Sequence, residues 1–133
     1  MNDPLITGQR LNALGQTIGL DLDDSGQRPI PPLTAMTGRF CSVVPLSIEH
    51  ARDLYTAFRE DPEDRIWTYL PNGPYHDAEA FRAWMHKAIT WDDPLMHAIV
   101  VDGRALGHAS YLRISPKDAS IEIGYINLSP ALQ

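Results

Sequence analysis

The sequence has little cysteine, little positive charge and no long apolar run, and each shortage excludes a class of protein. Cys41 is the only cysteine among the 133 residues, so no internal disulfide can form and a reducing compartment is favoured. No apolar stretch approaches the roughly 20 residues that a membrane-spanning helix needs. The first residues also lack the basic start and apolar core of a signal peptide. We therefore expect a cytoplasmic protein with no membrane partner.

The overall charge is acidic. The 17 Asp and Glu residues outnumber the 11 Lys and Arg residues and give a net charge of −6, and the basic residues are scattered singly. Such a surface is repelled by the phosphates of nucleic acids, so we expect no nucleic-acid partner. The hydrophobic fraction of 44% is ordinary for a globular chain, and the length allows one domain.

Patterns that bind metal ions are scarce as well. The five histidines stand apart from one another, and no HExxH or CxxC pattern occurs. Asp21, Asp23 and Ser25 resemble the first ligands of a calcium loop, but Pro32 stands at the twelfth position, where a glutamate is needed. We therefore expect no metal site.

Residues 1–38 show neither a sustained helical period nor a sustained strand period. Glycines and prolines interrupt them, and the segment around Pro29, Pro31 and Pro32 cannot be helical, because proline lacks the amide donor and holds its predecessor extended. This region is interpreted as an extended N-terminal arm with room for one short strand.

Residues 39–46 are apolar and rich in strand-forming types, so they predict the first strand, and Pro45 indicates an edge position or a strand end. Ser47 then has the character of a helix N-cap. Apolar residues follow at the spacing of one helix face, and Asp61 and Pro62 predict its end. That face consists of Ala51, Leu54, Tyr55 and Phe58.

A loop is predicted over residues 64–75, which combine three aromatic side chains with several turn formers. Asp77 predicts the N-cap of a second helix, and Pro94 follows the end of that helix. The buried face of the second helix is predicted to contain Phe81, Trp84, Met85, Ala88 and Ile89.

From residue 95 onward the apolar pattern has the period of strands. Residues 95–101, 105–114 and 120–128 predict three consecutive strands. Asp102 and Gly103 between the first two are a strong signal for a two-residue hairpin turn, because both central positions of a type I′ turn need positive φ. The three strands therefore form an antiparallel meander.

This order of elements resembles the first half of the acetyl-CoA-dependent N-acetyltransferases of the Gcn5-related superfamily. Residues 67–75 (Trp-Thr-Tyr-Leu-Pro-Asn-Gly-Pro-Tyr) resemble the loop between the first two helices in the branch of the ribosomal-protein (RimJ/RimL-like) acetyltransferases. Gly107 stands where the family has a glycine in its third strand, and residues 120–125 (Ser-Ile-Glu-Ile-Gly-Tyr) resemble the fourth. The resemblance implies an α/β (α+β) fold with a mixed sheet, of which residues 39–133 would be the N-terminal half.

The resemblance also implies a chemistry, which is the transfer of an acetyl group from the thioester of acetyl-CoA to a primary amine. A base must accept the proton of the attacking amine, and backbone N–H groups stabilise the oxyanion. In the family, the pantetheine arm pairs with the fourth strand much like another strand. The acceptor would be a protein N-terminus or a small molecule, and the sequence does not choose between them.

Glu122 is the residue that the resemblance offers as the general base, because some family members place a glutamate there. The alternative is an exposed glutamate that is solvated or paired across strands. Simple alternation along the strand predicts that Glu122 shares a face with Ile126 and Leu128, opposite Ile123 and Tyr125.

Two further groups of residues are implied by the resemblance. Asn127 and Leu128 match positions whose backbone would meet the acetyl carbonyl and the pantetheine, and ordinary ladder pairing is the alternative. Trp67, Tyr69 and Tyr75 would line the pocket of the acceptor amine, and the alternative is a loop that pins itself with its own aromatic side chains.

The family's pyrophosphate loop and third helix would come after residue 133, so the resemblance implies that they are missing from this sequence. We therefore expect little acetyltransferase activity from this chain alone. Two alternatives stay open, namely a non-catalytic module that forms a homodimer through the strand at residues 120–128, and an inactive fragment.

Overall fold

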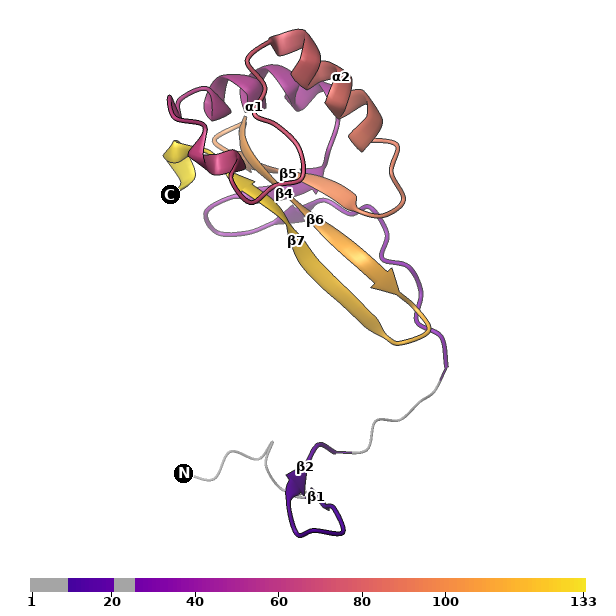
Figure 1. Cartoon of the computed structure of the whole chain (residues 1–133). Coiled ribbons are helices and arrows are strands. Elements are labelled where there is room, and N and C mark those ends of the chain that lie inside the picture. The colour runs from indigo at the N-terminus through magenta and orange to yellow at the C-terminus, as the bar shows by residue number, and fades with distance from the viewer. Residues whose placement is uncertain (1–9, 21–25) are drawn as a thin grey trace.

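Five strands form one antiparallel sheet, and two helices cover one of its faces (Figure 1). This computed structural model describes residues 10–20 and 26–133. The predicted α/β fold is confirmed, with its strand, two helices and three-stranded meander in the expected order. No helix within the described residues is long and apolar enough to cross a membrane.

The sheet has the order β3-β4-β5-β6-β7, and neighbouring strands are antiparallel throughout the described pairings. Two of the predicted strands have the expected bounds, and the others differ by a few residues at their ends. The strands are β3 (Met36–Thr37), β4 (Ser42–Pro45), β5 (Leu95–Val101), β6 (Arg104–Ser115) and β7 (Ser120–Leu128).

Pro45 is the last residue of β4 and lies where β3 no longer pairs, so its missing amide donor breaks no ladder bond to that side. Of the two predicted positions for Pro45, the structure therefore has the strand end, since β4 lies between β3 and β5. The turn between β5 and β6 is also as predicted, since Asp102 has a φ of 49° and Gly103 a φ of 78°.

The helices begin where the capping residues predict. The 3₁₀ turn η2 (Ile48–His50) follows Ser47, whose amide donates to His50 Nδ1 at 3.1 Å, and continues into α1 (Ala51–Phe58). The helix α2 (Ala78–Ala88) starts after Asp77, whose carboxylate accepts the amide of Glu79 at 2.8 Å. Two further 3₁₀ turns, η3 (Arg65–Trp67) and η4 (Pro130–Leu132), complete the described helical elements.

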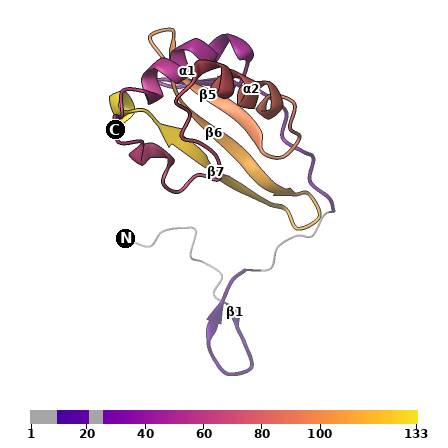
Figure 2. The same ribbon diagram turned by 45° about the horizontal axis from the view of Figure 1, so that its top comes forward.

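The two helices lie over one face of the sheet (Figure 2). The core lies between them and the sheet, and aromatic side chains dominate it. Phe58 of α1 meets Trp67 and Phe81 edge-on, with ring centroids 5.3 and 6.0 Å apart. Phe81 and Trp84 of α2 are 5.5 Å apart. Such large rings bury much apolar area and favour edge-on contacts, so the helices are held over β6 and β7 in one orientation.

The N-terminal arm contributes more structure than the one short strand that was expected. A small hairpin joins β1 (Arg10–Leu11) to β2 (Thr17–Ile18), and β3 extends the main sheet. The arm also contacts the β6–β7 turn, where the amide of Arg28 donates to the carbonyl of Pro116 at 3.1 Å. A division into an arm of residues 1–38 and a domain of residues 39–133 stays a prediction.

Candidate functional site

A bulge interrupts β7 at the level of the core aromatic residues. His108 of β6 pairs with Asn127, and Ser110 pairs with Gly124, so Ala109 alone lies opposite two residues of β7. One of these is Tyr125, whose φ of 51° is left-handed. An L-residue in this conformation is strained by about 1 kcal/mol or more, so the surrounding structure must hold it in place.

The bulge changes which side chains face the helices. The Tyr125 ring stacks on Trp84 of α2 at 6.5 Å and contacts Trp91 at 6.3 Å, so it lies on the helix side of the sheet. Asn127 is buried, whereas the Ile126 side chain is 48% exposed. The alternation predicted from the sequence is therefore wrong beyond Gly124, because the bulge adds a residue and reverses the faces.

Two side chains of β6 bond to successive carbonyls at the bulge. Ser110 Oγ donates to the carbonyl of Gly124 at 3.0 Å, and His108 Nδ1 lies 3.0 Å from the carbonyl of Tyr125. Because a carbonyl oxygen can only accept, Nδ1 of His108 must carry the proton. The side chains of β6 thus bond to β7 where the backbone ladder is disturbed.

His108 is fully buried, and its ring lies 5.5 to 5.8 Å from the rings of Phe58, Trp84 and Tyr125. This burial lowers the pKa of His108 to about 4, although the bond to the Tyr125 carbonyl partly opposes the shift. The imidazole is therefore neutral at neutral pH. Its Nε2 atom is buried without a hydrogen-bond partner among the described residues, as are the side-chain polar atoms of Asn127 and Ser129.

The loop before α2 is tied to the bulge by one amide. The Tyr125 hydroxyl donates to Asn72 Oδ1, and Asn72 Nδ2 donates to the Tyr75 hydroxyl at 3.0 Å. Burial raises the pKa of both tyrosines, so the two hydroxyls keep their protons at neutral pH. Hydrogen bonds through the Asn72 side chain therefore connect the loop over residues 64–75 to β7.

The three aromatic residues predicted for an acceptor pocket do not converge. Trp67 is buried and meets Phe58 and Tyr75 edge-on, whereas the Tyr69 side chain is 97% exposed. Gly73 has a φ of 77° and passes so close to Trp67 that a Cβ atom would overlap the indole ring. Trp67 and Tyr75 thus anchor the loop, and a substrate-binding role for Trp67, Tyr69 and Tyr75 stays a prediction.

Glu122 lies on the helix side of β7, before the bulge in the chain. Its side chain forms an ion pair with Arg113 of the neighbouring strand β6. Its Oε2 atom lies 3.3 Å from Nη1 of Arg113, and the side chains of Arg113 and Glu122 are 81% and 45% exposed. An ion pair of this kind contributes little to stability. Gly124 leaves room for the carboxylate, since a Cβ atom there would lie 3.0 Å from Glu122 Oε1. A catalytic role for Glu122 stays a prediction.

The two residues predicted to meet the cofactor present different backbone edges. The amide of Ser129 donates to the carbonyl of Leu106, so by alternation the backbone of Asn127 also faces β6. The backbone of Leu128 then faces the outer edge of β7, where its carbonyl accepts from Gln133 Nε2 at 2.9 Å. Leu128 is therefore the better placed of the two to pair with a ligand at that edge.

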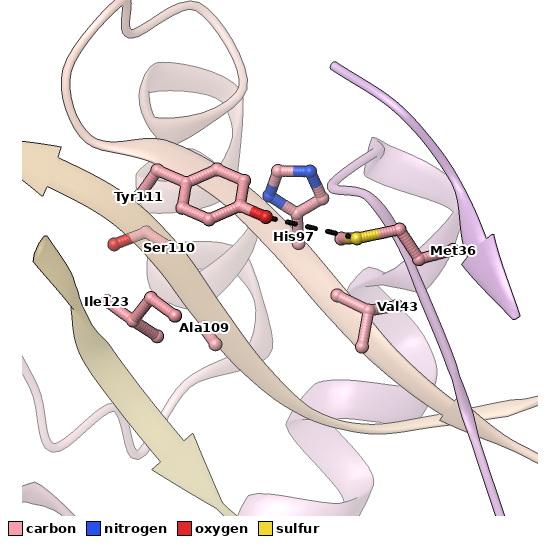
Figure 3. A pocket seen from close by; sticks show the side chains of 7 residues that line it. All are labelled: Met36, Val43, His97, Ala109, Ser110, Tyr111 and Ile123. Carbon is pink, nitrogen blue, oxygen red and sulfur yellow. Dashed lines mark hydrogen bonds between the residues drawn. The ribbon is translucent and has the colours of Figure 1, made fainter. Parts of the chain in front are cut away.

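A shallow apolar groove lies on the sheet face away from the helices (Figure 3). The Tyr111 hydroxyl donates weakly to the Met36 sulfur at 3.9 Å across it, and His97 is buried beside them. The groove is lined by Met36, Val43, His97, Ala109, Ser110, Tyr111 and Ile123. Its composition fits an apolar side chain better than a charged group.

Residues 10–20 and 26–133 contain no group of three or more His, Cys, Asp or Glu residues that could hold a metal ion. The segment that resembles a calcium loop, residues 21–25, is outside the described residues.

The structure is similar to solved acetyltransferases. A Gcn5-related N-acetyltransferase from Brucella melitensis is 30% identical, with a TM-score of 0.79 over 84% of this chain and 52% of its own. A GNAT-family protein from Chromobacterium violaceum is 29% identical, with a TM-score of 0.74 over 87% of this chain and 59% of its own. The chain has the fold of the Gcn5-related N-acetyltransferases.

This chain spans about half the length of these GNAT relatives. A third structure, of an acetyltransferase from T. thermophilus, is 23% identical with a TM-score of 0.63 and supports the fold alone. No known family model matches the sequence, and no curated protein matches it either.

The features that the sequence analysis missed are the bulge and its partners His108, Ser110 and Asn72. A signal was present, because a glycine inside a strand pattern, here Gly124, often marks a bulge. The left-handed residue is Tyr125 and not the glycine itself, so the pattern points to the right place but not to the right residue.

The buried His108 predicts a pH dependence of stability. The folded-state pKa of about 4 is below the ordinary value of 6.5, so between these values the unfolded chain binds a proton that the folded chain does not. The free energy of unfolding should therefore fall as the pH falls. From pH 7 to pH 5 it should fall by about 2 kcal/mol more in the wild type than in a His108→Asn variant. Urea titrations at several pH values measure this, and equal slopes would contradict it.

Proposed function

We propose that this chain contains the part of an N-acetyltransferase that binds the thioester arm of acetyl-CoA. The enzyme would transfer the acetyl group to a primary amine. The proposal is supported by the fold, by the Gcn5-related relatives at about 30% identity and by the bulge in β7. The bulge is the observation that carries it. A strained break in the strand that resembles the thioester-binding strand is a feature that functional sites retain.

The proposed reaction is a nucleophilic substitution at the thioester. The amine nitrogen attacks the acetyl carbonyl carbon, a C–N bond forms, and the C–S bond of acetyl-CoA breaks. The nitrogen loses a proton to a base, and the departing thiolate gains one to become free CoA. The site must therefore bind the carbonyl oxygen as it becomes negative, and it must hold a base near the amine.

The outer edge of β7 suits the thioester arm. Within the described residues β7 pairs with β6 alone, and the backbone of Leu128 faces the free edge. A pantetheine arm carries two amide groups, so it would pair with this edge as an added strand does. Gln133, whose side chain now bonds to the carbonyl of Leu128, would have to move aside.

The acceptor would approach from the loop over residues 64–75. Asn72 ties this loop to Tyr125, and the Tyr69 side chain projects from it into solvent. The contact between this loop and the bulge supports the proposal that an incoming amine would meet the loop. A protein N-terminus or a small-molecule amine would fit equally well.

The first test is a calorimetric titration of the 133-residue chain with acetyl-CoA and, separately, with acetyl-pantetheine. We expect both to bind, with dissociation constants within a factor of about three, a difference of less than about 0.7 kcal/mol. The reason is that the proposed contacts are made with the pantetheine arm, whereas charge-assisted bonds to the phosphates would add roughly 1.5–3 kcal/mol each. Binding of neither compound at millimolar concentration would contradict the proposal.

The role of Glu122 is tested against that of its ion-pair partner. If Glu122 accepts the amine proton, Glu122→Gln should lower kcat/KM by a factor of about 10²–10⁴. Arg113→Ala is the matched control, because it breaks the same ion pair and leaves the carboxylate in place. Thiol release from acetyl-CoA, with a short peptide carrying a free N-terminus as the acceptor, measures both. Equal losses in the two variants would assign the pair a structural role.

A second candidate function, pairing with another copy of the chain, is favoured by the apolar side chains along β7. The side chains of Ile121, Ile123 and Ile126 are 47%, 68% and 48% exposed. Alternation places Ile121 and Ile123 on the face away from the helices, and the bulge brings Ile126 to the same face. Two copies joined edge to edge through β7 would form one continuous sheet and bring these isoleucines together.

Sedimentation over a range of concentrations tests this pairing. We expect a dimer for the wild type and a shift toward monomer in an Ile123→Lys variant. In a dimer of this variant, the lysine of one copy would lie close to the lysine of the other, and the two positive charges would repel each other. Leu14→Lys is the control, since Leu14 is 83% exposed in the β1–β2 hairpin and far along the chain from β7. A wild type that stays monomeric at high concentration rules out the pairing.

A further inference from the structure

The bulge in β7 leaves two successive carbonyl groups that the ladder to β6 cannot both serve. Ala109 is the single residue opposite Tyr125 and Ile126, so one backbone position of β6 faces two of β7. The carbonyls of Gly124 and Tyr125 meet the side chains of Ser110 and His108, at 3.0 Å each, and Gly124 is also the ladder partner of Ser110. Both carbonyls are therefore held on the β6 side of the strand.

Holding a carbonyl on one side fixes the amide on the other side. A trans peptide group is planar, and its N–H points opposite to its C=O. The two described cis bonds precede Pro74 and Pro94, so the peptide groups of the bulge are trans. The N–H of Tyr125 and the N–H of Ile126 consequently both point away from β6, toward the free edge. Two successive N–H groups on one side form a concave site for an anionic oxygen.

We propose that His108 and Ser110 are positioning residues for acetyl transfer, which hold the Tyr125 and Gly124 carbonyls so that the amides of Ile126 and Tyr125 face the thioester oxygen. This inference rests on the proposed acetyltransferase function. Hydrogen bonds from these two amides would strengthen as the carbonyl oxygen becomes an oxyanion, which is how fixed donors lower the barrier.

The surroundings of His108 suit this task. The ring is enclosed by Phe58, Trp84 and Tyr125 and therefore has little freedom to rotate. Its neutral state keeps one N–H, on Nδ1, directed at the Tyr125 carbonyl. A buried donor fixed in this way can keep Tyr125 at positive φ, where a tyrosine would not stay unaided.

The test compares two substitutions of His108 in the full 133-residue chain. His108→Asn keeps an N–H donor close to the position of Nδ1, and His108→Leu removes the donor while keeping an apolar side chain of similar bulk. Ser110→Ala removes the second donor with little change in volume. Thermal unfolding and circular dichroism first establish that each variant folds.

Two readouts are then measured on the wild type and on each folded variant. The first is the intraresidue amide-to-α-proton NOE of Tyr125, which is strong only at positive φ. The second is the affinity for acetyl-pantetheine by calorimetry, together with kcat and KM for thiol release from acetyl-CoA. We expect His108→Leu to lose the strong NOE and to lower kcat by at least about tenfold. His108→Asn should keep the NOE and retain kcat within about threefold, and Ser110→Ala should lie between them.

Each outcome decides the inference. If His108→Leu keeps the positive φ, or loses it with kcat and affinity unchanged, His108 is not a positioning residue. If His108→Asn loses as much activity as His108→Leu, the effect comes from the packing of the ring and the inference fails. If the wild type neither binds acetyl-pantetheine nor releases thiol, the acetyltransferase proposal itself fails and the positioning role fails with it, even where the NOE shows that His108 holds the bulge.

Discussion

The geometry of the site depends on one buried hydrogen bond, from the imidazole of His108 to the carbonyl of Tyr125. Through this bond β6 reaches the carbonyl of the strained residue, and the packing of the Tyr125 ring on Trp84 supports the same conformation. The aromatic core supplies the enclosure that keeps the imidazole neutral and fixed. The same aromatic rings therefore serve two purposes. They bury apolar area in the core, and they hold the N–H donor of His108 in place.

The same arrangement connects the strand to the loop before α2. Asn72 bonds to both Tyr75 and Tyr125, and Trp67 anchors the loop by lying over Gly73. The loop and the strand that carries the free edge are thus joined through the Tyr125 hydroxyl. Under the proposed function this connection would matter, because the acyl donor and the amine acceptor must meet at one place.

The fold was largely readable from the sequence, and the site was not. The hairpin at Asp102 and Gly103, the cap at Asp77 and the bounds of β5 and β7 follow from local chemistry, because turn, cap and alternation depend on neighbouring residues. The bulge depends on contacts between Tyr125 and distant aromatic residues, and no local rule predicts a tyrosine at positive φ. The roles of Glu122, Leu128 and Asn127 stay predictions.

The bulge also sets which side chains of β7 face the helices beyond Gly124. In a straight strand, Ile126 and Leu128 would turn inward and Asn127 and Ser129 outward, which is the ordinary amphipathic arrangement and the one that the sequence pattern favours. The structure has the opposite arrangement, with Asn127 and Ser129 buried. The ring of Tyr125, packed against Trp84, thus acts as a lock on the register. Which side chains β7 shows to solvent beyond Gly124 therefore depends on how this one residue is held, by its ring on Trp84 and by its carbonyl on His108.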